Sequence, residues 1–334
     1  MKRAGNVWAV VLAGGEGSRL SQISIDPRGR KVPKQFCSVL GGESLLQKAL
    51  RRARALAGTR RTMAVVAADQ RCWWSAELME YPADNIIVQP CNRGTACGVM
   101  LPLMQILIRD EDATVLVLPS DHVVADEAVL LDAIRMATDL ARREPGQLIV
   151  LGLEPERPDT GLGWIAPGTR ENVPVRSVAR FVEKPPRDLA EDLVREGALW
   201  NSSIFAMRAV DLFGLFQWAL PWMTRMFTYS LVDERGGTND ERISRLYARL
   251  PSVDFSRAIL QEAGEHMRVL TVPPCGWTDV GTPAGVARCG LHSQACPTER
   301  GAALTRAPVD LVEALRAFED GMNLVDRSAG PDNQ

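Results

Sequence analysis

Short aliphatic runs alternate with helix-like segments over about the first 155 residues, and this alternation most limits the folds open to the chain. The runs are almost continuously apolar, as strands buried on both faces of a sheet are. They lie at 7–13, 62–68, 85–90 and 147–153, and another begins at residue 114. The segments between them place apolar residues near the helical period, at 44–57, around 70–80, at 95–109 and at 127–143. We therefore predict a Rossmann-like α/β fold, in which a mostly parallel sheet carries helices on both faces.

The pattern changes after about residue 155, where the strands shorten and Gly and Pro become more frequent. We expect strands at 176–185, 201–207 and 266–273, with a mainly helical stretch at 208–250. This half is interpreted as a lid or a substrate-binding extension on the same sheet. A further helix is expected at 310–318, in a short C-terminal segment.

Charge and composition exclude several classes of protein. Lys and Arg number 39 and Asp and Glu 41, so the net charge of −2 gives no overall attraction to nucleic acid or to an anionic membrane. No apolar stretch approaches the ~20 residues of a membrane span, and the first apolar run is too short for a signal peptide. Seven cysteines without a C-x-x-C pair, beside three histidines, make a zinc site unexpected. We expect a cytoplasmic protein with reduced thiols that binds neither nucleic acid nor membrane.

The sequence VVLAGGEGSRL at 10–20 places three glycines directly after the first predicted strand. It is not a Walker A loop, because no Lys-Ser or Lys-Thr follows, and it lacks the third glycine of a dinucleotide-binding fingerprint. Two interpretations remain open: a tight strand exit with positive φ, or a turn whose backbone N–H groups bind phosphate. The basic segment DPRGRKVPKQF at 26–36 follows it. That segment is either a partner for a ligand with several negative charges or a solvated loop.

A series of motifs resembles the sugar-1-phosphate nucleotidyltransferases, and within them the mannose-1-phosphate guanylyltransferase type. The first are LAGGEGSRL and PKQF, and the others occur in the order typical of that family over roughly residues 7 to 285. They are QPCNRGTA at 89–96, LPSDH at 118–122, TGLGWI at 160–165, FVEKP at 181–185, LWNSSIF at 199–205, SVDFSRAIL at 252–260 and WTDVG at 277–281. Each motif is weak alone, but chance agreement would have to hold in every one.

The resemblance implies transfer of GMP from GTP to mannose 1-phosphate, with release of pyrophosphate and with Mg²⁺ as cofactor. The implied nucleotidyltransferase domain spans 1–285, with a nucleotide half at about 1–155 and a sugar-binding half at about 156–285. A helical tail segment at 286–334 follows it. A homodimer is the candidate assembly.

The resemblance also implies roles for individual residues. Asp121 and Asp279 would hold the Mg²⁺, since carboxylate oxygens suit this ion. Arg19 and Lys34 would stabilise the triphosphate and the leaving pyrophosphate. The nucleotide would contact the turn at Leu12, Ala13, Gly14, Gly15 and Gly17, and the base segment at Gln89, Arg93, Thr95 and Ala96. The sugar phosphate would contact Gly163, Glu183, Lys184 and Asn201.

Simpler roles compete with several of these assignments. Asp121 could be a helix N-cap, Asp279 a turn residue, and Glu183–Lys184 a surface ion pair. The chain also departs from the guanylyl type, which usually has Asn at the position of Gly94, Pro at Cys97, Tyr at Trp164 and Gly at Ser203. Transfer with another nucleotide or hexose 1-phosphate is therefore the alternative activity. A non-catalytic paralogue that binds nucleotide sugar is the alternative outside catalysis.

Overall fold

A computed structural model of the chain describes residues 6–17, 20, 22–39, 41–168, 175–232, 239–292 and 309–317. These residues group into two compact units, each made of several chain segments. Unit 1 comprises 1–14, 50–119 and 126–275, and unit 2 comprises 15–49, 120–125 and 276–334 as far as these are described. The predicted halves on either side of residue 155 and the tail from residue 286 stay predictions.

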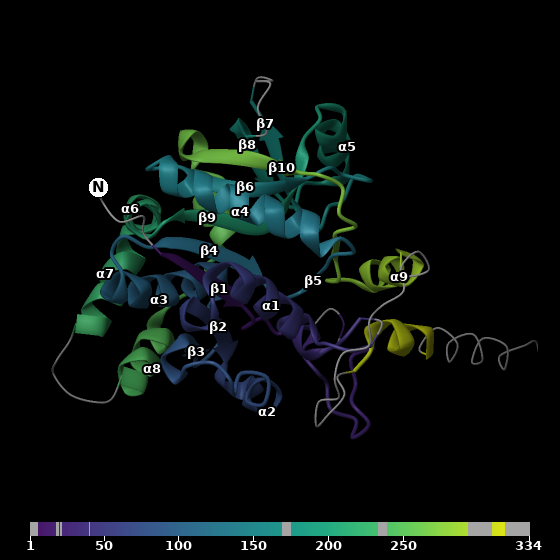
Figure 1. Cartoon of the computed structure of the whole chain (residues 1–334), viewed down its shortest axis with the longest axis horizontal. Helices are drawn as coiled ribbons and strands as arrows, with labels where there is room; N and C mark the ends of the chain where they lie inside the picture. Colours follow the sequence, from purple (N-terminus) through teal and green to yellow (C-terminus); the bar gives the residue numbers. More distant parts are fainter. Residues whose placement is uncertain are drawn as a thin grey trace, which may run out of the picture. The chain divides into compact units, whose positions relative to one another are not determined.

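Unit 1 is built on one large sheet (Figure 1). Its strands are β1 (Val7–Leu12), β2 (Thr62–Ala67), β3 (Ile86–Gln89), β4 (Thr114–Pro119), β6 (Leu148–Leu153), β7 (Gly163–Pro167), β8 (Val175–Glu183), β9 (Leu199–Arg208) and β10 (Met267–Val272). Across the described residues, the order in the sheet is β3-β2-β1-β4-β9-β6-β10-β8-β7. The α/β fold class predicted from the sequence is confirmed.

The direction of the strands is more mixed than the sequence suggests. Strands β3, β2, β1 and β4 pair in parallel, as do β6 and β10. Strand β9 lies between β4 and β6 and is antiparallel to both, and β8 and β7 continue the sheet in antiparallel pairs. A strand buried on both faces has the same apolar pattern in either direction, so periodicity does not report this difference.

The helices form where apolar residues recur at the helical period. They are α1 (Leu45–Ala57), α2 (Arg71–Trp74), α3 (Gly94–Arg109), α4 (Glu127–Arg143), α5 (Arg187–Arg195), α6 (Ala209–Ala219), α7 (Pro221–Val232), α8 (Asn239–Arg249) and α9 (Pro283–His292). The helix expected around 70–80 is wrong in length, because α2 ends at Trp74, whose indole Nε1 donates to the Ala67 carbonyl at 2.8 Å.

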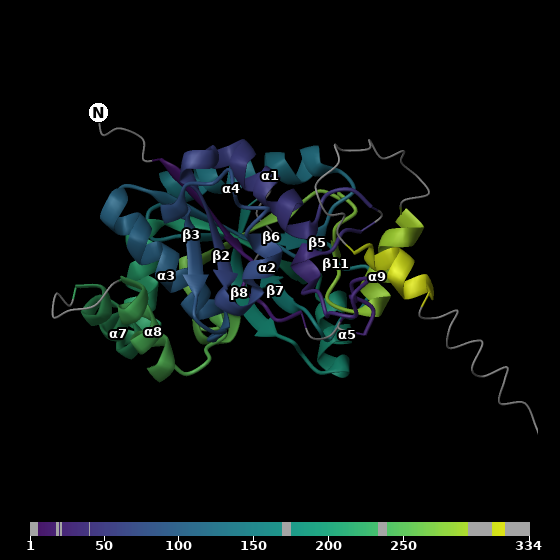
Figure 2. The ribbon, with the colours of Figure 1, turned by 90° about the horizontal axis from the view of Figure 1, so that it is seen from below.

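Helices of unit 1 cover both faces of its sheet. Helix α3 packs on β1, β2 and β3, and α4 packs on β4, β6, β9 and β10. Figure 2 shows α4 on the opposite side of the strands from α3, α7 and α8. Successive side chains of a strand point to opposite faces of a sheet, and β1 is buried on both faces. Val10 belongs to the apolar cluster under α3, whereas its fully buried neighbours Ala9 and Val11 do not. The predicted double-sided cover is confirmed.

Unit 2 contains a short antiparallel ladder between β5 (His122–Val123) and β11 (Thr278–Asp279). Ser38 forms isolated bridges with Ser44 and with Asp310. Residues 311–317 are helical, close to the expected 310–318, and Asp310 caps this helix by accepting from Val312 N at 2.9 Å. Among the described residues, no helix combines the length and apolar character needed to cross a membrane.

Candidate functional site

The glycine turn begins where β1 leaves the sheet of unit 1. Ala13 N donates to Val65 O at 2.8 Å, and Gly14 follows directly. A Cβ atom at Gly14 would lie 2.7 Å from Oε1 of Gln89, so this glycine permits the close approach of a side chain. Gln89 ends β3 at the same carboxyl edge of the sheet, where open α/β sheets bind ligands.

The rest of the turn belongs to unit 2 and contacts the basic segment predicted to serve it. Gly17 has φ +63°, and a Cβ there would lie 2.8 Å from Lys34 N. The Gln35 amide donates to Gly15 O at 2.8 Å, with the Gln35 side chain buried. The turn therefore has the positive φ of a tight exit and is also held against the PKQF segment. Arg19, predicted to bind the triphosphate, lies outside the described residues.

An ion pair joins Lys34 to Asp121 within unit 2. Lys34 Nζ lies 2.5 Å from Asp121 Oδ2, and the Asp121 side chain is a quarter exposed. Burial by itself raises the pKa of this carboxyl, but the Lys34 ammonium, His122 and the hydrogen bonds to the carboxylate together outweigh burial and lower the pKa from 3.8 to about 2. Asp121 is therefore an anion at any physiological pH.

The β5–β11 ladder brings Asp279 to the neighbourhood of Asp121. Asp279 pairs with His122, the residue after Asp121. The Trp277 indole donates to Nδ1 of His122 at 3.1 Å, and both side chains are buried. Asp279 Oδ1 accepts from Gly281 N at 2.8 Å, which orients this carboxylate at the start of a turn. The ladder thus places Asp279 opposite the residue that follows Asp121, although the two predicted metal ligands are 158 positions apart in the chain (279 minus 121).

These two carboxylates fit a magnesium ion better than a transition metal. Among the described residues, no group of three or more His, Cys, Asp or Glu side chains is arranged to hold a metal. Mg²⁺ is typically bound by one or two carboxylates together with waters and substrate phosphates, so a pair of aspartates is a sufficient protein contribution.

The residues predicted to bind the sugar phosphate cluster within unit 1. Gly163 pairs with Glu183 across β7 and β8, and a Cβ at Gly163 would lie 2.7 Å from Glu183 Oε2 and 3.4 Å from Asn201 Cβ. Lys184 has φ +50° and places Nζ 3.0 Å from Glu183 Oε1, whose side chain is 7% exposed. Asn201 Oδ1 accepts from Ser203 N at 3.0 Å. The structure brings these four residues together, and their contact with a sugar stays a prediction.

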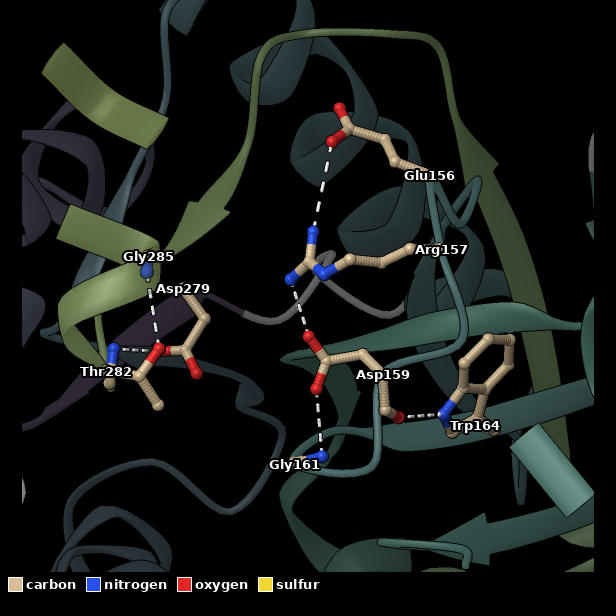
Figure 3. A network of polar contacts seen from close by, with 9 residues as sticks. Glu156, Arg157, Asp159, Gly161, Trp164, Asp279, Thr282 and Gly285 are labelled. Carbon is tan, nitrogen blue, oxygen red and sulfur yellow. Dashed lines mark hydrogen bonds and ion pairs between the residues drawn. The ribbon is translucent and has the colours of Figure 1, made fainter. Parts of the chain in front are cut away.

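A polar network before β7 was not found from the sequence (Figure 3). Arg157 lies over the ring of Trp200 at 5.1 Å and forms an ion pair with Asp159 at 2.5 Å. Asp159 in turn accepts from Gly161 N at 2.8 Å and, through its carbonyl, from Trp164 Nε1 at 2.8 Å. The network therefore fixes the loop that leads to Gly163. Turn-forming residues at 158–161 could have indicated the loop from the sequence. They could not have indicated that Arg157 stacks on Trp200.

The predicted base segment is held by the segment that follows α8, also in unit 1. Val253 N donates to Arg93 O and Ala96 N donates to Val253 O, both at 3.0 Å. Thr95 Oγ1 accepts from Phe255 N at 2.8 Å. Arg93 Nε donates to Tyr247 O at 2.9 Å, so this guanidinium has a structural partner. Gly94 has φ +79°, and a Cβ there would lie 2.2 Å from Val253 O, which explains the absence of a larger residue.

Comparison with known proteins gives a consistent result. A family model described as nucleotidyl transferase matches residues 8–289. The xanthan biosynthesis protein XanB of Xanthomonas campestris is 30% identical over 83% of this chain and 58% of its own length. A mannose-1-phosphate guanylyltransferase of Salmonella muenchen is 34% identical over 82% of this chain and 57% of its own. The chain thus spans a little over half the length of these curated relatives.

Solved structures support the same fold. A protein of Thermus thermophilus described as a mannose-1-phosphate geranyltransferase matches with a TM-score of 0.73 and 26% identity. The match covers 96% of this chain and 99% of that one. A UDP-glucose pyrophosphorylase structure, 13% identical with a TM-score of 0.53, shares the fold.

Proposed function

The chain belongs to the nucleotidyl transferase family, and from this premise we propose that it transfers GMP from GTP to mannose 1-phosphate and releases pyrophosphate. The observation that carries the proposal is the aspartate pair of unit 2, in which the β5–β11 ladder brings Asp279 beside the Lys34-paired Asp121. The similarity to mannose-1-phosphate guanylyltransferases supports the choice of substrates.

The reaction is an in-line attack of a sugar phosphate oxygen on the α-phosphate. Both reactants are anions, so the protein accelerates it by positioning them and by neutralising charge. In this proposal Lys34 and Arg19 stabilise the phosphates of GTP and the leaving pyrophosphate. Asp121 and Asp279 would hold Mg²⁺, which when bound neutralises phosphate charge.

The residues of the Gly163 cluster would bind the other substrate. Lys184 supplies a cation for the phosphate of mannose 1-phosphate. Glu183 accepts hydrogen bonds from sugar hydroxyls, and the Asn201 amide can accept from them or donate to them. Glu183 keeps its position because its carboxylate is nearly buried beside Gly163 and paired with Lys184. The homodimer and the cytoplasmic location stay predictions.

Pyrophosphate release tests the proposal directly. The assay uses Mg²⁺, each of GTP, ATP, UTP, CTP and dTTP, and either mannose 1-phosphate or glucose 1-phosphate. Turnover selective for GTP with mannose 1-phosphate supports the assignment. A preference for another nucleotide or sugar phosphate would contradict the proposed substrates but leave the nucleotidyl-transfer reaction in place. No turnover with any pair, together with tight binding of a nucleotide sugar, supports the non-catalytic paralogue.

A pair of isosteric variants connects the activity to the site. Asp279→Asn keeps the side-chain shape but removes the negative charge that a metal ion needs. We therefore expect kcat to fall by at least about a hundredfold, which is the upper end of the range for groups that position a metal site. Asp310→Asn, also in unit 2, is the matched control because Asn caps a helix as well as Asp does. Equal activity of the two variants would contradict the metal assignment.

A further inference from the structure

Tyr247 lies buried beside the end of β3, in α8, and makes two hydrogen bonds through its hydroxyl. The Gln89 side-chain amide donates to Tyr247 Oη at 2.8 Å, and the hydroxyl donates to the Cys97 carbonyl at 3.4 Å. Tyr247 and Cys97 are fully buried and Gln89 is 4% exposed. All of these residues belong to unit 1.

The two bonds together determine how the Gln89 carboxamide is turned. The Cys97 carbonyl can only accept, so the Tyr247 proton is directed to it and a lone pair faces Gln89. Only the NH₂ group of Gln89 can satisfy that lone pair, so its carbonyl oxygen must point the other way. Burial raises the pKa of Tyr247, so the phenol keeps this proton at every physiological pH.

The outward-turned oxygen of Gln89 lies against the glycine turn. It would be 2.7 Å from a Cβ at Gly14, which shows how closely it approaches this turn. Within the described part of the chain, no donor reaches this oxygen, although the Gln89 side chain is more than nine-tenths buried. The oxygen is not among the buried side-chain atoms that lack a hydrogen-bond partner, so it is accessible, and a ligand N–H that reached it would form a hydrogen bond that the described residues do not supply. Its position at the carboxyl edge of β3 is where such a ligand binds.

We propose that Tyr247 is a positioning residue for nucleobase selection, which fixes the Gln89 carboxamide so that its oxygen accepts from a ring N–H of the base. Guanine at N1, and uracil or thymine at N3, present such an N–H. Adenine at N1 and cytosine at N3 present a lone pair, which the fixed oxygen repels. This inference rests on the proposed nucleotidyl transfer and extends it to the origin of base selectivity.

The kinetic test compares wild type with Tyr247→Phe, which removes the hydroxyl and keeps the ring that packs edge-to-face on Phe227. In Tyr247→Phe the amide is released and can present its NH₂ to the base, so the ratio of kcat/KM for GTP over ATP falls about fivefold to tenfold. Tyr229→Phe, whose side chain is 75% exposed, is the matched control and leaves the ratio unchanged. An equal loss for all nucleotides in Tyr247→Phe shows a merely structural role and overturns the proposal. Wild-type preference for ATP or CTP overturns it while leaving the transfer chemistry intact.

A second measurement does not depend on activity. In protein labelled with ¹⁵N-glutamine, the Gln89 side-chain NH₂ signals are assigned by their loss in Gln89→Glu. We expect slow hydrogen exchange of these protons in wild type and at least tenfold faster exchange in Tyr247→Phe. Unchanged exchange overturns the proposal even if no nucleotide is turned over, so failure of the proposed function and failure of this inference are separable.

Discussion

Gly94 offers a quantitative test of how the base segment is held. A Cβ at this position meets three backbone atoms of Val253, the oxygen at 2.2 Å, the carbon at 2.7 Å and the nitrogen at 2.8 Å. Backbone atoms cannot rotate away as the end of a flexible side chain can. In Gly94→Ala the two segments must therefore separate.

The magnitude has two parts. An L-residue at φ +79° costs about 1 to 2 kcal/mol. Separation also breaks the Ala96 N–Val253 O and Val253 N–Arg93 O hydrogen bonds, each worth about 0.5 to 1.5 kcal/mol. We expect a total loss of about 2 to 5 kcal/mol in the free energy of unfolding.

Gly146→Ala is the matched control, because Gly146 has φ +78° and nothing lies within 4 Å of its Cβ position. It should lose only the strain of about 1 to 2 kcal/mol. Gly94→Asn further distinguishes the backbone strain from the loss of the two hydrogen bonds, since Asn tolerates positive φ but still carries a Cβ. Urea denaturation followed by tryptophan fluorescence gives the free energies. Equal losses at Gly94 and Gly146 would refute the close-approach argument.

Three further predictions concern stability and reactivity. Ser203 is exposed at φ +57°, so Ser203→Gly should stabilise the protein by about 1 kcal/mol and raise Tm by about 1 to 2 °C in calorimetry; an unchanged or lower Tm would contradict this. Arg52 is 3% exposed and donates twice to Glu127 at 2.7 Å, so Glu127→Ala should destabilise the protein in urea. The loss should fall below the roughly 3 to 5 kcal/mol of a fully buried pair, because Glu127 is a quarter exposed and water can reach the site; no loss would show that the pair contributes nothing. Burial raises the pKa of Cys97 to about 12 and that of Cys289 to about 11, so both stay neutral thiols at pH 8, and their alkylation should accelerate as pH rises toward those values. Exposed Cys72 should react first in a mass-spectrometric time course, and early labelling of Cys97 would contradict its burial.

Most elements of the fold could be predicted from periodicity alone, because buried strands and amphipathic helices have distinct spacings of apolar residues. The direction of β9 could not, since Leu199–Arg208 has the same burial pattern whichever way it runs. The aspartates at 121 and 279 were identified through motifs, and the structure adds that one ladder makes them neighbours.

The orienting role of Tyr247 was missed for a different reason. Gln89 and Tyr247 are separated by 158 positions, and no local pattern links a buried hydroxyl to a distant amide. The stacking of Arg157 on Trp200 was missed likewise. Such pairs depend on tertiary packing, which a single sequence does not display.

The three-part origin of unit 2 has a consequence for synthesis on the ribosome. The ladder that brings the two aspartates together pairs His122 with Asp279, which lie 157 positions apart in the chain (279 minus 122). Because the chain emerges from its N-terminus, β1 and β2 can pair early, whereas β5 must wait for β11 until residue 278 has been made. Such distant pairing is slow, since the entropy of closing a long loop must be overcome first. A nascent chain halted before residue 278 therefore lacks the ladder, so the aspartate pair is assembled late in translation.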